Sequence, residues 1–154
     1  MSVEPVHKQI VVAASADTAF RVFTDGMERW WPRDHYIGTS PVNRMTVEPR
    51  VDGRWYQIAE DGSESNWGKV LVWDPPYRLV LAWQLTAEWQ YDAAFVTEVE
   101  VTFTAEGPST TLVAVEHRNL DRFGPSAGEK RKSFDAPGGW TQTLESFARI
   151  AEGR

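Results

Sequence analysis

Residues 45–117 consist of short segments rich in β-branched and aromatic residues, with turn-forming residues between them. Asp61-Gly62 is typical of a tight hairpin, and Pro75-Pro76 and Gly107-Pro108 each mark a chain reversal. Because connections this short leave no room for crossover helices, the segments are expected to pair as antiparallel strands. The predicted strands span residues 45–48, 54–60, 66–73, 77–85, 96–104 and 110–117.

One strand and two short helices are predicted before this run. Residues 5–14 read as a strand, and Ser15 follows as a helix N-cap, because its hydroxyl can accept a hydrogen bond from an amide of the first turn. This helix ends at Asp25-Gly26, and residues 27–31 allow one more turn before Pro32. The apolar residues at helical spacing in the first helix are Ala16, Ala19, Phe20 and Phe23.

Helical patterns return after Asn119. Ser126 and Glu129 have the spacing of a capping box at the start of a short helix. In the last segment, one stripe carries Trp140, Leu144, Phe147 and Ala151, so this final helix needs a partner surface. The order of elements predicts an α+β fold, in which a curved antiparallel sheet of six to seven strands wraps around a long C-terminal helix. We expect one domain over residues 1–154, since a chain of this size can bury one core.

The composition excludes several classes of function. The chain has 22 acidic and 16 basic side chains, and the formal charge of −6 disfavours binding to nucleic acid or acidic lipid through clustered Lys and Arg. The absence of cysteine excludes disulfides, thiol nucleophiles and thiolate metal sites. No secretory signal is visible, and the apolar runs fall far short of the roughly 20 residues that cross a bilayer. We therefore expect a cytoplasmic protein with no membrane span and no nucleic-acid partner.

Local motifs predict no catalytic constellation. Residues 124–128 match the G-x-S-x-G pattern of serine hydrolases, but a polar loop precedes them where a buried strand is required. The three histidines stand far apart, with no metal-ligand spacing. Glu98 and Glu100 lie about 7 Å apart along a strand, on the face opposite to Val99, so a solvated outer face is favoured over an acid–base pair. No catalytic residue, metal or cofactor is predicted.

The strand registers indicate which side chains point inward. Val99, Val101 and Phe103 alternate with polar residues, so they define the dry face of their strand. Trp83 shares a parity with leucines, and His117 shares one with Val113 and Val115. His117 has two interpretations, a neutral imidazole satisfied by a neighbouring group or a polar anchor or proton-transfer group for a bound molecule, and sequence does not separate them. The inward residues expected on the strand at 54–60 are Trp55 and Gln57.

The eight tryptophans are the most informative group of side chains. Each buried indole N–H needs a hydrogen-bond partner, so an interior filled solidly with indoles is hard to pack. The excess therefore indicates a cleft walled by aromatic residues, although an ordinary core with surface patches remains an alternative. A stacking platform for nucleic acid is disfavoured by the acidic balance. The tryptophans are Trp30, Trp31, Trp55, Trp67, Trp73, Trp83, Trp89 and Trp140.

Several sequence patterns together resemble a known family. These are VEPRVDGRW at 47–55, GKVLVWDPP at 68–76, LVLAW at 79–83, EHRNL at 116–120 and Gly139-Trp140. They are similar to homologues of the activator of heat-shock-protein-ninety ATPase, within the START-related helix-grip (SRPBCC) superfamily. The resemblance implies a seven-stranded antiparallel sheet gripping a long C-terminal helix, with a hydrophobic cavity between them for a lipid-like or aromatic molecule. Members include co-chaperone domains, ligand carriers and polyketide cyclases, so the resemblance does not fix the function.

Our leading hypothesis is the binding of a small hydrophobic or aromatic molecule between the sheet and the final helix. The alternatives are a co-chaperone-like module that binds a chaperone or other protein through its outer surface, and a cyclase- or hydratase-like enzyme using His117. A homodimer stays open, and residues 89–94 are a candidate lid or contact loop. The predicted ligand-binding residues are Trp55, Trp83, Val99, Val101 and Phe103 on the sheet, Trp140 and Leu144 on the helix, Trp31 at the mouth, and Gln57 and His117 as polar anchors.

Overall fold

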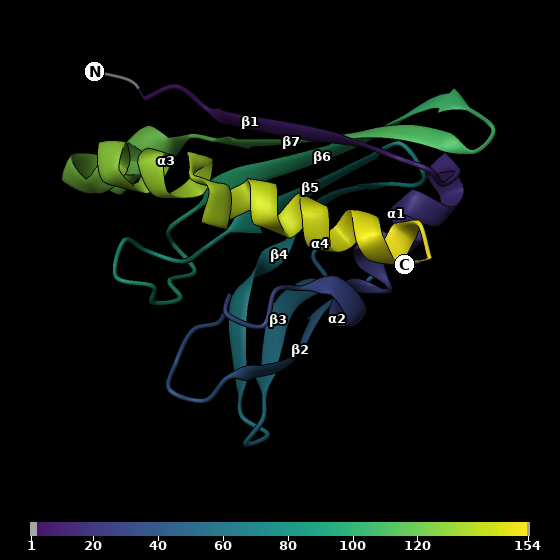
Figure 1. The fold of residues 1–154 in the computed structure, drawn as a ribbon. Coiled ribbons are helices and arrows are strands. Elements are labelled where there is room, and N and C mark those ends of the chain that lie inside the picture. The colour runs from purple at the N-terminus through teal and green to yellow at the C-terminus, as the bar shows by residue number, and fades with distance from the viewer. Residues whose placement is uncertain (1–2, 154) are drawn as a thin grey trace.

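Seven antiparallel strands form one curved sheet in the computed structural model, which describes residues 3–153 (Figure 1). The strand order is β1-β7-β6-β5-β4-β3-β2, so β1 pairs with the last strand and all other neighbours are consecutive in sequence. This arrangement confirms the predicted antiparallel α+β fold. The strands are β1 Val6–Val12, β2 Val42–Val47, β3 Arg54–Ala59, β4 Glu64–Asp74, β5 Arg78–Trp83, β6 Thr97–Gly107 and β7 Thr110–Arg118.

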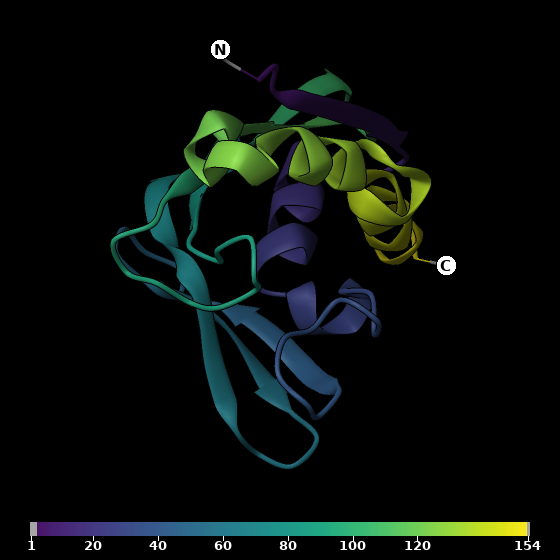
Figure 2. The ribbon, with the colours of Figure 1, turned by 90° about the vertical axis from the view of Figure 1, so that its left-hand side faces the viewer.

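The helices lie on one side of the sheet, and α4 packs beside β1, α1 and α2 (Figures 1 and 2). Ser15 caps α1 as predicted, because its hydroxyl accepts a hydrogen bond from the Thr18 amide at 3.2 Å. The face of α4 that meets the sheet and α1 buries Leu144, Phe147 and Ala151, as the stripe indicates. The helices are α1 Ala16–Thr24, α2 Met27–Trp30, α3 Ala127–Asp135 and α4 Gln142–Ala151, with short turns η1 Leu120–Ser126 and η2 Pro137–Thr141.

The entry to α3 and its exit differ from the sequence-based prediction. Ser126 makes no capping hydrogen bond, and the predicted capping box is wrong, because η1 already brings the chain into α3 in a helical conformation. After α3 the chain breaks at Gly139, whose ψ of −126° is not helical. A Cβ on Gly139 would lie 2.3 Å from the Phe134 carbonyl oxygen, so this close turn requires glycine. Trp140 therefore lies in η2, just before α4.

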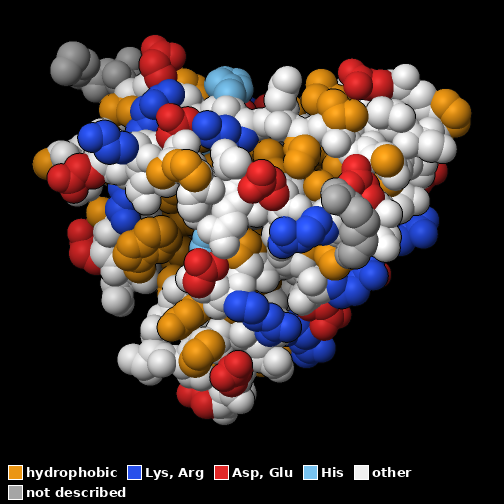
Figure 3. Space-filling view, viewed as in Figure 1, with side chains coloured by type: hydrophobic (Ala, Val, Ile, Leu, Met, Phe, Trp, Pro, Cys, Tyr) orange, Lys and Arg blue, Asp and Glu red, His pale blue; other side chains and the backbone are white. Residues whose placement is uncertain are grey.

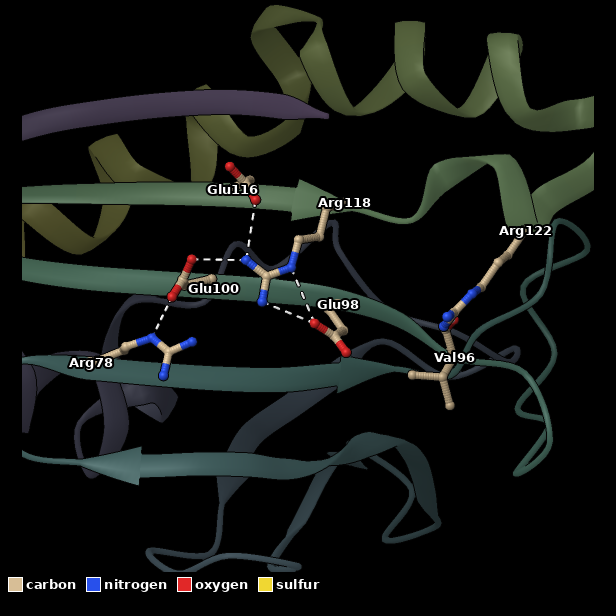
Figure 4. A network of polar contacts seen from close by, with 7 residues as sticks. All are labelled: Arg78, Val96, Glu98, Glu100, Glu116, Arg118 and Arg122. Carbon is tan, nitrogen blue, oxygen red and sulfur yellow. Dashed lines mark hydrogen bonds and ion pairs between the residues drawn. The ribbon is translucent and has the colours of Figure 1, made fainter. Parts of the chain in front are cut away.

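The predicted strand registers are confirmed. Val99, Val101 and Phe103 are at most 2% exposed, and Trp55, Gln57, Trp83 and His117 are at most 5% exposed. On the opposite face of β6 and β7, Arg118 donates hydrogen bonds to Glu98, Glu100 and Glu116 at 2.8–3.1 Å (Figure 4). Arg78, on β5, forms an ion pair with Glu100. Glu98 and Glu100, which were considered as an acid–base pair, therefore belong to an ion-pair network on the outer face.

Candidate ligand-binding site

An open cleft of about 350 Å³ lies where the segment after α2, the ends of β4 and β5, α3 and the start of α4 meet. Its size is at the lower end of the range for small-molecule sites. Figure 3 shows hydrophobic side chains gathered on the left of this face, below α3. The cleft is lined by Trp31, Asp34, His35, Tyr36, Trp67, Trp83, Trp89, Ser133, Phe134, Gly138, Gly139, Trp140 and Thr143.

Aromatic rings that meet edge to face build the wall of the cleft. The ring centroids of Trp67 and Trp83 are 5.3 Å apart with planes at 83°, and Trp31 meets Trp67 at 5.5 Å and 87°. Phe134 on α3 meets Trp83 at 5.3 Å and 72°. Because edge-to-face pairs are a favoured geometry, these rings hold one another in place and leave ring surface facing the cleft.

The indole N–H groups of three lining tryptophans are bonded within the protein. Trp31 donates to the His35 carbonyl oxygen at 2.8 Å, Trp67 donates to Gln57 Oε1 at 2.9 Å, and Trp140 donates to His117 Nδ1 at 3.2 Å. These donors fix the orientation of the rings. They are not free to bond a molecule in the cleft.

Gln57 fastens the segment after α2 to the sheet. Its Oε1 accepts hydrogen bonds from the Ile37 amide and the Trp67 indole, both at 2.9 Å, and its Nε2 donates to the Ile37 carbonyl oxygen at 2.9 Å. The side chain is 1% exposed and does not line the cleft. Gln57 therefore lies outside the lining and holds Trp67 and the segment around Ile37 in position.

His117 lies behind Trp140 with both ring nitrogens bonded. Nδ1 accepts from the Trp140 indole, so the neutral ring carries its proton on Nε2, which lies 2.9 Å from Thr97 Oγ1. Phe134 stacks on the ring at 4.5 Å between centroids. Complete burial lowers the pKa of His117 to about 3, so the imidazole is neutral at physiological pH. These contacts match the interpretation of a satisfied neutral imidazole.

The predicted site residues separate into two groups. Trp31, Trp83 and Trp140 line the cleft. The others lie in the interior, covered by different parts of the chain. Phe20 and Phe23 of α1 pack on Phe103 at 5.1 and 5.7 Å between ring centroids, and Phe134 and Trp140 cover His117. The cleft is therefore confined to the end of the sheet away from α1. The residues outside its lining are Trp55, Gln57, Val99, Val101, Phe103, His117 and Leu144.

The polar side of the cleft comes from residues that the sequence analysis did not select. His35 Nε2 lies 3.1 Å from the Gly138 carbonyl oxygen, which only accepts, so this nitrogen carries a proton. Gln142 donates to Asp34 Oδ1 at 3.3 Å, and Thr143 donates to the Gly139 carbonyl oxygen at 3.2 Å. Asp34 and His35 lie in an irregular segment, whereas Gln142 and Thr143 begin α4. Their signal in the sequence is their position next to Trp31 and Gly139-Trp140.

The segment after β5 forms the outer rim of the cleft. Trp89 is 42% exposed, and its backbone has a left-handed φ of 61°. The Lys130 ammonium lies 4.0 Å from the centre of the Trp89 ring. Gln84 ties the segment down by donating to the Ala93 carbonyl oxygen at 3.0 Å. Trp89 is thus an exposed aromatic group at the mouth.

Residues 3–153 contain neither a membrane-spanning helix nor a cluster of metal-binding side chains. No helix there is long and apolar enough to cross a membrane. Within the same residues, no group of three His, Asp or Glu side chains has an arrangement that could hold a metal ion.

Comparison with known proteins extends these observations. A solved structure of the anthrahydroquino-gamma-pyrone synthase Txn09, complexed with SUM, is 38% identical, with 97% of each chain covered and a TM-score of 0.68. The self-sacrificing resistance protein CalC from Micromonospora echinospora is 32% identical over 97% of this chain and 95% of that one, with a TM-score of 0.72. The Aha1 dimer from Colwellia psychrerythraea shares the fold at 16% identity, with 97% of each chain covered and a TM-score of 0.61.

A search of curated proteins gave no match. The family model described as Activator of Hsp90 ATPase homolog 1-like protein matches residues 13–152. The seven-stranded sheet and its helices agree with the resemblance drawn from the sequence motifs. The chain belongs to the Activator of Hsp90 ATPase homolog 1-like family.

Proposed function

We propose that this protein binds a small, mostly apolar aromatic molecule in the cleft beside Trp83. The observation that carries the proposal is the lining itself, in which aromatic side chains from six parts of the chain converge on one open space, namely the segment after α2, β4, β5, the segment after β5, α3 and η2. Aromatic and apolar walls with a few polar groups are typical of small-molecule sites. A 38% identical relative named as a synthase of an anthrahydroquinone-type product supports a ligand with fused rings.

The proposal is tested by filling the mouth of the cleft. Ser133 is exposed on α3 and lines the cleft, so Ser133→Trp places a large side chain in the opening without disturbing the core. Lys132→Trp is the matched control, because Lys132 is an exposed neighbour that does not line the cleft. N-phenyl-1-naphthylamine, a neutral aromatic probe that fluoresces in apolar surroundings, reports binding.

We expect the probe to bind the wild type and Lys132→Trp equally, and Ser133→Trp at least about tenfold more weakly, since a blocked site loses the buried area that drives binding. Equal binding to all three proteins would place the probe elsewhere and contradict the proposal. A broader panel of fatty acids, sterols and aromatic polyketides, followed by tryptophan emission, extends the test. No response across the panel would also count against it.

Catalysis on the bound molecule is a second candidate function, favoured by the relative named as a synthase. His35 is better placed for proton transfer than His117, because His35 lines the cleft and His117 does not. If the protein is an enzyme, His35→Gln is expected to abolish turnover and preserve probe binding. Turnover that survives this substitution would remove His35 from the reaction.

A further inference from the structure

Charge is distributed unevenly around the cleft. Asp34 is the one side chain with a permanent charge among the lining residues that the structure describes, and Lys and Arg are absent from that lining. Its carboxylate is 71% exposed and accepts one hydrogen bond, from the neutral amide of Gln142. The fixed charge of the lining is therefore negative, in a chain of net charge −6, and the Lys130 ammonium lies outside the lining at the mouth.

Several hydrogen-bond donors in the lining are already in use, and those left over, on Tyr36, Trp83, Trp89 and Ser133, belong to neutral side chains. The indoles of Trp31, Trp67 and Trp140 donate to protein acceptors, and His35 Nε2 faces the Gly138 carbonyl oxygen. A carboxylate or phosphate entering the cleft would lose water and find neutral donors but no Lys or Arg among the described lining residues. Burying an anion without a paired cation is costly, so the lining disfavours acidic ligands.

Aromatic ring faces attract cations, and the fold already uses this attraction at the mouth. The Lys130 ammonium lies 4.0 Å from the centre of the Trp89 ring. Ring faces carry negative electrostatic potential, and tryptophan is the strongest of the aromatic side chains in binding cations. Trp31, Trp67, Trp83 and Trp140 offer further ring surface inside.

We propose that the cleft selects aromatic cations, meaning flat ring systems that carry a quaternary or protonated nitrogen, over neutral and anionic molecules of the same shape. The inference rests on the proposed function and adds the charge of the ligand to it. The rings are held by the tryptophans and Phe134, the positive charge is stabilised by ring faces and Asp34, and Lys130 competes for Trp89.

Three probes with the same three-ring framework test the charge preference by calorimetry at pH 8. They are 10-methylacridinium as the cation, acridine as the neutral molecule and acridine-9-carboxylate as the anion. We expect the cation to bind about tenfold more tightly than acridine, and the anion to bind most weakly. Added salt should weaken binding of the cation and leave acridine unaffected, because screening acts only on the charged probe.

Two variants, Asp34→Asn and Lys130→Met, test which side chains produce the preference for the cation. Asp34→Asn is expected to weaken binding of 10-methylacridinium about threefold and leave acridine unchanged, as expected for one exposed carboxylate. Glu60→Gln, which removes an exposed charge outside the lining, is the control. Lys130→Met removes the competing ammonium and should strengthen binding of the cation.

The opposite pattern overturns the inference. If acridine-9-carboxylate binds most tightly and Lys130→Met weakens it, the cleft is an anion site that depends on Lys130. Equal affinity for all three probes also refutes charge selection, and leaves the proposed aromatic binding intact. If none of them binds, the proposed function itself fails.

Discussion

His117 and Arg118 are neighbours in β7, and they face opposite environments. The His117 ring is fully buried among Trp83, Phe134 and Trp140, and stays neutral. The Arg118 side chain is 26% exposed and keeps its charge among three glutamates (Figure 4). The inner face accommodates the polar His117 ring because both ring nitrogens are hydrogen-bonded. On the outer face, the charge of Arg118 is neutralised by ion pairs that are partly exposed to solvent.

The two faces are expected to differ in their contribution to stability. A buried ring adds apolar area, packing contacts and satisfied hydrogen bonds, and its loss leaves a cavity. Exposed ion pairs gain little, because water already solvates both charges and salt screens them. Substitutions on the inner face should therefore lower the free energy of unfolding several times more than those on the outer face.

The largest effect is expected for Trp83→Ala. Trp83 meets six aromatic rings with centroids within 6.1 Å, so its removal opens a cavity at the junction of the cleft and the core. We expect the free energy of unfolding to fall by about 3–5 kcal/mol, measured by denaturant titration followed by circular dichroism. Tyr77→Ala, at a residue that is 64% exposed, is the control and should change it by less than about 0.5 kcal/mol. Similar losses in both variants would contradict the comparison.

The second effect is a pH dependence that comes from His117. Its pKa is about 3 in the folded protein, against roughly 6.5 in an unfolded chain, so the unfolded state binds more protons between these values. Stability is fully present above pH 6.5 and falls by about 1.4 kcal/mol per pH unit below it, down to about pH 3. Over pH 7 to 5, the wild type should lose about 2 kcal/mol through this group.

The His117→Gln variant isolates the contribution of His117 to the pH dependence of stability. The amide can still accept from Trp140 and donate to Thr97, but it does not titrate in this range. Unfolding free energies at pH 7 and pH 5 should therefore differ less in the variant than in the wild type, by about 2 kcal/mol. His7 and His35 are present in both proteins, so their contributions cancel. Equal pH dependence would show that His117 is not buried in its neutral form.

The interior was easier to predict from sequence than the cleft. Alternation places Val99, Val101, Phe103 and His117 on the inner face, because a strand has a period of two wherever its neighbours are regular. The orientation of Trp67 could not be predicted from this alternation, because the register between β3 and β4 shifts between Trp55 and Tyr56. A bulge of this kind has no clear signature in a single sequence.

The polar side of the cleft could not be derived in the same way. Asp34 and His35 lie in an irregular segment, and the hydrogen bonds donated by His35, Gln142 and Gln57 that hold it join residues far apart in sequence. The space beneath α4 was also open to two interpretations, because the sequence does not show that Phe20 and Phe23 fill it. Tertiary packing, which local patterns do not encode, decides both.

The smallest effect is expected on the outer face. Arg118→Met keeps most of the aliphatic stem and removes the charge that bridges Glu98, Glu100 and Glu116. We expect a loss of about 1 kcal/mol in the free energy of unfolding at low ionic strength, shrinking in 1 M salt, because ion pairs near the surface contribute roughly 0.2–1 kcal/mol each and are screened.

Arg50→Met is the matched control, since Arg50 is 66% exposed and pairs with one carboxylate, that of Glu48. It should cost only a few tenths of a kcal/mol. Arg78 remains bonded to Glu100 in the Arg118→Met variant, and this hydrogen bond is the largest cause of the lowered pKa of Glu100. Arg118→Met should therefore leave that carboxylate ionised at neutral pH. A loss of 3 kcal/mol or more that persists in 1 M salt would show that Arg118 stabilises the sheet through packing, and that the two faces of β7 are more alike than their charges indicate.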